Sequence, residues 1–250
     1  PSTLQMCVMK MYKKNCKHRE CPNNQVELFT HDEVHSTVMS IYNQVEQKLS
    51  EKKYADGSTL CLCFLYHVRN DDGTVQESIN NDENIETNLN NLAKRKLLTA
   101  HLGDARALIM RTDGTSRTLT VDHKPFMRSE YERVHNEFGY LIGNRIDGVL
   151  AVSRSMGDRC VTSVGHKIEI NEFDIDENDQ YLIIGCDGVF DVLSNDEVAN
   201  IAYNSYSPND AAHRIRNAAF GVGSNDNISV IVVDLVNKHH EHHHHKPNQS

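Results

Sequence analysis

The sequence has no tryptophan, and aromatic residues make up only 6% of its 250 positions. Hydrophobic residues reach 38%, which is lean but enough for a globular fold once the polar segments are set aside. No apolar run approaches the ~20 residues that a membrane-spanning helix requires, and no signal-peptide pattern is visible. We therefore expect a globular protein that does not work in a membrane.

An excess of positive charge is absent as well. The formal net charge is −9, which argues against a general nucleic-acid binder. A disulfide framework is also not indicated, because the seven cysteines are odd in number and scattered along the chain. Free thiols fit a reducing compartment, so we expect an intracellular location, either cytoplasmic or nuclear.

Composition divides the chain into three parts. Residues 1–29 form an irregular N-terminal segment with a basic cluster, and residues 30–236 are expected to form one domain. An insertion at 69–93 is rich in Asn, Asp and Glu, and it cannot bury enough apolar surface to offset the cost of ordering. Residues 237–250 are a His-rich tail, either an expression remnant or a native low-complexity tract.

Capping-box patterns mark two helix starts. Thr30-His31-Asp32-Glu33 precedes apolar residues at three- and four-residue spacing, which predicts an amphipathic helix ending near Lys53. Ser194-Asn195-Asp196-Glu197 predicts a second helix through Ala202. Helix patterns also cover residues 130–138 and 210–220.

Short apolar runs bounded by turn residues predict buried strands at 58–66, 149–152, 180–186 and 228–235. Residues 97–102 and 105–110 flank Gly103-Asp104, and this pattern predicts a β-hairpin. Strands and helices do not alternate as βαβ units. We therefore expect an α+β fold with antiparallel sheets and helices packed outside them.

Two acidic residues stand at the ends of two predicted buried strands. Asp187 follows the apolar run that ends at Cys186, and Asp226 precedes the run that begins at Ile228. Carboxylate oxygens are the ligands that hard cations such as Mg²⁺ and Mn²⁺ prefer. The pair is therefore a candidate divalent-metal site that could activate water for hydrolysis.

Seven segments of the chain then form an ordered set, which runs Gly57-Ser58-Thr59, Gly103-Asp104-Ala105-Arg106, Asp122-His123-Lys124-Pro125, Glu130-x-x-Arg133-Val134, Ser153-Arg154-Ser155-Met156-Gly157-Asp158, Cys186-Asp187-Gly188-Val189-Phe190-Asp191 and Ser224-x-Asp226-Asn227-Ile228. This order resembles the metal-dependent serine/threonine protein phosphatases of type 2C, the PPM family. The resemblance covers about residues 30–236.

The resemblance implies an α-β-β-α sandwich, in which two antiparallel sheets pack face to face between helices. It implies two Mg²⁺ or Mn²⁺ ions and a phosphorylated protein as substrate. Asp187 is similar to the central acidic metal ligand of the family and Asp226 to a second. Asp104 is similar to the ligand of a third, weaker metal site. No residue of this chain is assigned as a catalytic acid or base, and we read His123 and Arg154 as structural contacts.

The sequence departs from the family at its N-terminal motifs. The family carries an Asp-Gly-His-Gly-Gly segment that supplies a metal-bridging Asp, and no Asp-Gly-His occurs in these 250 residues. We therefore expect an N-terminally incomplete phosphatase domain that is weak or inactive alone. The alternative is a catalytically inactive pseudophosphatase that acts as a binding or regulatory module.

Overall fold

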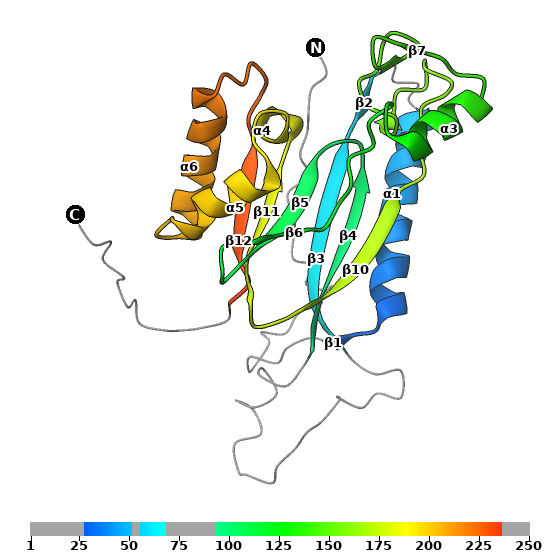
Figure 1. Ribbon diagram of the computed structural model, residues 1–250. Coiled ribbons are helices and arrows are strands. Elements are labelled where there is room, and N and C mark those ends of the chain that lie inside the picture. The colour runs from blue at the N-terminus through cyan, green and yellow to red at the C-terminus, as the bar shows by residue number, and fades with distance from the viewer. Residues whose placement is uncertain (1–27, 52–55, 69–93, 237–250) are drawn as a thin grey trace.

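The computed structural model describes residues 28–51, 56–68 and 94–236. Two four-stranded sheets stack face to face, and helices cover both outer faces (Figure 1). The predicted α+β fold with packed antiparallel sheets is thus confirmed. The expected insertion at 69–93 and the His-rich tail at 237–250 lie outside the described residues, as does most of the basic segment at 1–29.

The first sheet has the strand order β1-β3-β4-β10, formed by Leu28–Phe29, Leu60–Val68, Arg95–Leu102 and Glu169–Ile175. The second sheet has the order β12-β11-β5-β6, formed by Val230–Asp234, Asp179–Gly185, Arg106–Arg111 and Ser116–Thr118. Two small two-stranded sheets pair β2 with β9 and β7 with β8, from Gly57–Ser58, Met156–Gly157, Leu141–Ile142 and Arg145–Ile146. One of these strand pairs is parallel, namely β1 with β3.

The helices lie on opposite sides of the sandwich. Helix α1 (His31–Glu51) packs on the outer face of the first sheet, and α5 (Asn195–Tyr203) and α6 (Pro208–Gly221) pack on that of the second (Figure 1). Both predicted capping boxes are present: Glu33 N donates to Thr30 Oγ1 at 3.2 Å, and Ser194 caps α5. None of the helices in the described ranges is long and apolar enough to cross a membrane.

Apolar side chains form three layers between these elements. The layer between the two sheets contains Cys61 and Cys63 of β3, Ile109 of β5 and Leu182 of β11. A second layer lies between α1 and the first sheet, and a third lies between α5, α6 and the second sheet. The buried strands and helices predicted from the apolar periodicity account for most of these contacts.

The predicted hairpin around Gly103-Asp104 is wrong. Strand β4 belongs to the first sheet and β5 to the second, so the turn at 103–105 carries the chain from one sheet to the other. Gly103 has a φ of +92°, a left-handed conformation that favours glycine. Asp104 therefore lies at the end of the sandwich where the chain changes sheets.

The predicted strand at 149–152 is also wrong. Only an isolated bridge between Ile146 and Leu150 forms there. These residues belong to a loop region that follows α3 (Arg128–Asn136) and contains the short β7–β8 hairpin. Val149 is 58% exposed, so the apolar run does not mark a buried strand.

Candidate metal centre

Asp187 lies where the central strand of the second sheet becomes helix. It is the first residue of the short helix α4 (Asp187–Phe190), directly after β11. Its Oδ1 accepts a hydrogen bond from the N–H of Gly188 at 2.8 Å. The preceding Cys186 is buried, and its thiol donates to the carbonyl of Asn227 at 3.0 Å. This contact ties the end of β11 to the segment that carries Asp226.

Gly188 allows α4 and the segment before β12 to approach closely. A Cβ atom at Gly188 would lie 2.3 Å from the carbonyl oxygen of Asn227 and 3.4 Å from Cβ of Asp226. The hydroxyl of Ser224 also donates to the carbonyl of Gly188 at 2.7 Å. Asp187 and Asp226 are therefore carried by two segments in direct contact, although 39 positions separate them in the sequence (226 − 187 = 39).

Asp104 is brought to the same place by the turn between the sheets. Its side chain is 3% exposed and pairs with the ammonium of Lys124. The same ammonium lies 3.5 Å from Oδ1 of Asp191, which is exposed at the end of α4. Burial raises the pKa of Asp104, while the charge of Lys124 opposes that rise.

The pKa of Asp187 reflects the charges of the other carboxylates at this end of the sandwich. Burial first, and then the negative charges of Asp104 and Asp226, raise the pKa of Asp187 to about 6. The charge of Asp191 raises the pKa of Asp187 by a smaller amount, whereas the hydrogen bond from the Gly188 N–H lowers it. Neighbouring like charges favour either a proton or a cation between them. Asp191 has no role in the sequence prediction, although its spacing of four from Asp187 places it one helical turn further on.

A second group of ligand-type side chains lies nearby: His101, His123 and Glu169 each offer a ligand atom within 4.8 Å of one another. The two imidazoles stack with centroids 4.6 Å apart and an interplanar angle of 6°. Imidazole lone pairs lie in the ring plane, so stacked rings do not aim them at one ion. Each ring also bonds backbone, since His101 Nε2 contacts Val121 O and His123 Nδ1 accepts from Gly103 N–H. The group is therefore a structural cluster.

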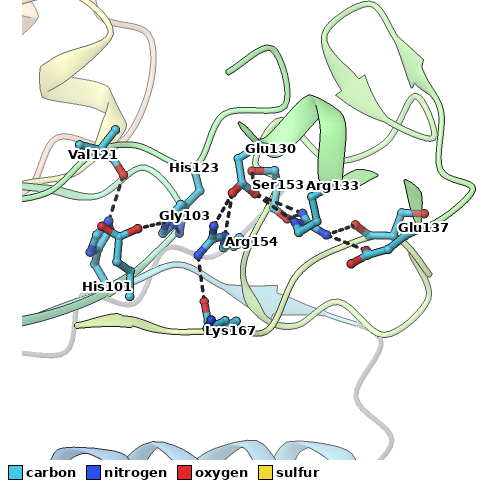
Figure 2. Close-up of polar contacts among 12 residues, drawn as sticks. His101, Gly103, Val121, His123, Glu130, Arg133, Glu137, Ser153, Arg154 and Lys167 are labelled. Carbon is cyan, nitrogen blue, oxygen red and sulfur yellow. Dashed lines mark hydrogen bonds and ion pairs between the residues drawn. The ribbon is translucent and has the colours of Figure 1, made fainter. Parts of the chain in front are cut away.

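Figure 2 shows the contacts of this cluster and, beside them, the polar network around Glu130 of α3. The N–H of Ser153, which belongs to that network, donates to the carbonyl of His123 at 2.8 Å. The buried carboxylate of Glu130 accepts from Arg154 Nε at 3.0 Å, from Ser153 Oγ at 2.8 Å and from Arg133 Nη2 at 3.2 Å. Burial alone would raise the pKa of Glu130, but the hydrogen bonds from Arg154 and Ser153 outweigh it and hold the pKa at about 2. These contacts agree with the interpretation of His123 and Arg154 as structural residues.

Comparisons with known proteins agree on one family. The family model described as Protein phosphatase 2C matches residues 23–228. Protein phosphatase 2C homolog 1 of Saccharomyces cerevisiae is 37% identical over 144 residues, covering 57% of this chain and 50% of the relative. Probable protein phosphatase 2C 59 of Arabidopsis thaliana is 32% identical over 196 residues, covering 76% and 63%. The chain thus spans about half to two thirds of these relatives.

Solved structures support the same fold. A crystal structure of a phosphatase from Toxoplasma gondii has a TM-score of 0.61 at 23% identity, covering 87% of this chain and 78% of that chain. The structure of a sex-determining protein of C. elegans has a TM-score of 0.52 at 26% identity, covering 58% and 40%. Because the Toxoplasma gondii phosphatase is only 23% identical to this chain, its similarity shows the fold alone.

Proposed function

Because the chain belongs to the protein phosphatase 2C family, we propose that it supplies carboxylate ligands to a divalent-metal site that hydrolyses phosphoserine and phosphothreonine in phosphorylated proteins. The observation that carries this proposal is the pKa of Asp187, raised to about 6 by burial and by the charges of Asp104 and Asp226. Three separate parts of the chain bring carboxylates close enough at one end of the sandwich for their charges to raise the pKa of Asp187. Such an arrangement is costly unless a cation neutralises it.

The donor set fits Mg²⁺ or Mn²⁺. Asp104, Asp187, Asp191 and Asp226 offer only oxygen ligands, which hard cations prefer. When bound, a pair of such ions supplies positive charge for the phosphoryl group and an activated water for hydrolysis. We assign Asp187 as the central ligand and Asp226 as a second. Asp104 would serve a third, weaker site, where a bound cation would compete with the ammonium of Lys124.

The chain's own residues prepare this site in two ways. Cys186, Gly188 and Ser224 hold the Asp187 and Asp226 segments against each other. Lys124 offsets the charge of Asp104 and reaches Asp191, which keeps the carboxylates together before any cation binds. The mechanism needs no covalent intermediate, so the buried thiol of Cys186 serves packing and hydrogen bonding.

Metal binding tests the proposal directly. We expect isothermal titration of the 250-residue chain with Mn²⁺ to give saturable binding. Asp187→Asn should weaken that binding by at least tenfold, and Asp226→Asn should also weaken it. Glu132→Gln is the matched control, because it removes one negative charge from an exposed position on α3. Equal affinities for the Asp187→Asn and Glu132→Gln variants would refute the assignment.

Turnover separates this proposal from the second candidate, a pseudophosphatase that binds a partner without chemistry. The second candidate is favoured by the lack of any Asp-Gly-His segment in these 250 residues. We expect the chain alone to hydrolyse phosphopeptides weakly with Mn²⁺. Robust turnover that Asp187→Asn abolishes would overturn this expectation of weak activity and exclude the pseudophosphatase.

An intracellular location, cytoplasmic or nuclear, is proposed on the state of the cysteines. All four cysteines in the described ranges are free thiols, and Cys61, Cys63 and Cys186 among them are buried. Free thiols persist in reducing compartments. Imaging of a fluorescently tagged chain tests this proposal, and signal confined to a secretory compartment would contradict it.

A further inference from the structure

Five consecutive residues, 120–124, hold the turn that carries Asp104, and we name this segment the clasp. Each clasp residue binds one residue of the strand ends: Thr120 binds Ala107, Val121 binds His101, Asp122 binds Arg106, His123 binds Gly103 and Lys124 binds Asp104. The pair between Asp122 and Arg106 is bidentate, with distances of 2.9 and 2.8 Å. The clasp therefore contacts both strands that meet at the turn.

His123 differs from the other clasp residues because it binds both backbone groups of one turn residue. Its Nδ1 accepts from the N–H of Gly103 at 3.0 Å, and its own N–H donates to the carbonyl of Gly103 at 2.8 Å. The Gly103 N–H is buried, so it has no water to replace this acceptor. With both groups bound, the left-handed conformation of Gly103 is fixed, and the direction of Asp104 follows from it.

Three further contacts hold His123, two through its ring and one through its backbone. Its Nε2 lies 3.2 Å from Oε2 of Glu169, its face stacks on His101, and its backbone carbonyl accepts from Ser153 N–H at 2.8 Å. Because Nδ1 accepts a hydrogen bond, the ring proton belongs on Nε2, where Glu169 receives it. Contacts outside the Asp104 turn thus hold the side chain, and the bond from Gly103 together with Glu169 sets the tautomer.

We propose that His123 is a positioning residue for the Asp104 carboxylate, acting through the two backbone groups of Gly103. This inference rests on the proposed function, because Asp104 is there a ligand of the metal site. His123 touches neither substrate nor metal in this assignment. Its acceptor atom keeps the turn in the one conformation that turns Asp104 toward Asp187 and Asp191.

Two substitutions of His123 separate its two ring nitrogens. His123→Asn keeps an acceptor at the position of Nδ1 and removes the donor to Glu169. His123→Gln keeps a polar group at the position of Nε2 and removes the acceptor for Gly103. We expect hydrogen exchange of the Gly103 amide to accelerate at least tenfold in the Gln variant and to change less than threefold in the Asn variant.

Mn²⁺ titration of the same variants gives the functional readout. At the weaker site assigned to Asp104, we expect the Gln variant to bind Mn²⁺ about tenfold more weakly and the Asn variant to stay within threefold of the unsubstituted chain. Equal exchange at Gly103, or equal Mn²⁺ affinity, in the two variants would overturn the inference. If the unsubstituted chain binds no Mn²⁺, the proposed function and the metal role of His123 both fail, while exchange at Gly103 still decides whether His123 holds the turn.

The unsubstituted chain offers a test that does not depend on how a variant folds. Nitrogen-15 NMR of the His123 ring should show a protonated Nε2 and an unprotonated Nδ1 at neutral pH. Burial lowers the pKa of His123 to about 4, which agrees with a neutral ring. A ring protonated at Nδ1 could not accept from Gly103, and this result would also overturn the inference.

Discussion

At the scale of single residues, the negative charge of Glu130 holds the region after α3 in place. The Glu130 side chain is 3% exposed, and its carboxylate accepts hydrogen bonds from two guanidinium groups and one hydroxyl. Arg133 also donates to the backbone carbonyl of Ser153, and Arg154 also donates to that of Lys167. One buried carboxylate therefore joins α3 to the loop that also holds the backbone of His123.

Glu130→Gln should lower the free energy of unfolding by about 3 kcal/mol, because the partly buried guanidinium of Arg154 loses its counter-charge and that of Arg133 keeps only Glu137. Urea unfolding at pH 7 measures this change. Glu132→Gln serves as the control, since its side chain is exposed on the same helix and its ion pair with Arg128 should contribute less than about 1 kcal/mol. Equal unfolding midpoints for the two variants would contradict the role of Glu130.

The pKa of Glu130 also predicts how this stabilisation depends on pH. Its folded pKa is about 2, below the ordinary value of about 4.3. The unfolded state therefore binds the proton more readily, so the stabilisation is present above about pH 4.3 and is lost as the pH falls toward 2. The difference in stability between the unsubstituted chain and Glu130→Gln should shrink over this range. A difference that stays constant with pH would show that the charge of Glu130 is not its source.

At the scale of elements, the site depends on the contact between α4 and the segment before β12. A Cβ atom on Gly188 would lie 2.3 Å from the backbone oxygen of Asn227, a distance that real contacts do not show. We expect Gly188→Ala to force these segments apart and to weaken Mn²⁺ binding by about tenfold, with a loss of 1–3 kcal/mol typical of overpacking. Isothermal titration and urea unfolding measure the two effects.

Gly221→Ala is the matched control for that substitution. Gly221 is the last residue of α6, and nothing lies within 4 Å of a Cβ atom built there. The control should bind Mn²⁺ as the unsubstituted chain does. Equal loss of binding in both variants would mean that the close approach at Gly188 does not shape the site.

The sequence predicts elements well where the signal is local. Both capping boxes lie within four residues, and the structure has them at α1 and α5. Strand β10 is missed, because Glu169, Glu172 and Asp174 give it a composition poor in strand-forming residues. In the fold Glu172 is held by Tyr66, Lys96 and His31, which lie far away in the sequence. Only tertiary contacts make this strand favourable.

At the scale of the whole molecule, the pattern of strand, turn and strand does not say which sheet each strand joins. Apolar runs on both sides of Gly103 predict two strands, but pairing is decided by partners elsewhere. Strand β4 pairs with β3 and β10, while β5 pairs with β11 and β6. Local sequence also predicts only part of the region around the site. Asp187 could be predicted because it directly follows a strand-like apolar run. The contacts among His101, His123 and Glu169 could not, because these residues lie 22 to 68 positions apart (123 − 101 = 22; 169 − 101 = 68).

The layer between the sheets should make the two sheets unfold as one unit. Ile109 of β5 is fully buried there, against residues of β3 and β11. Ile109→Ala should cost 2–5 kcal/mol through lost contacts and the cavity left behind. Because the layer is shared, slowly exchanging amides of β4 in the first sheet and of β11 in the second should lose the same free energy of opening.

Ile41→Ala, at a position that is 44% exposed on α1, is the control and should change both free energies of opening by less than about 0.5 kcal/mol. Loss of protection confined to β11 and its neighbours would instead show that each sheet opens separately, and the turn at Gly103-Asp104 would then join two independent halves.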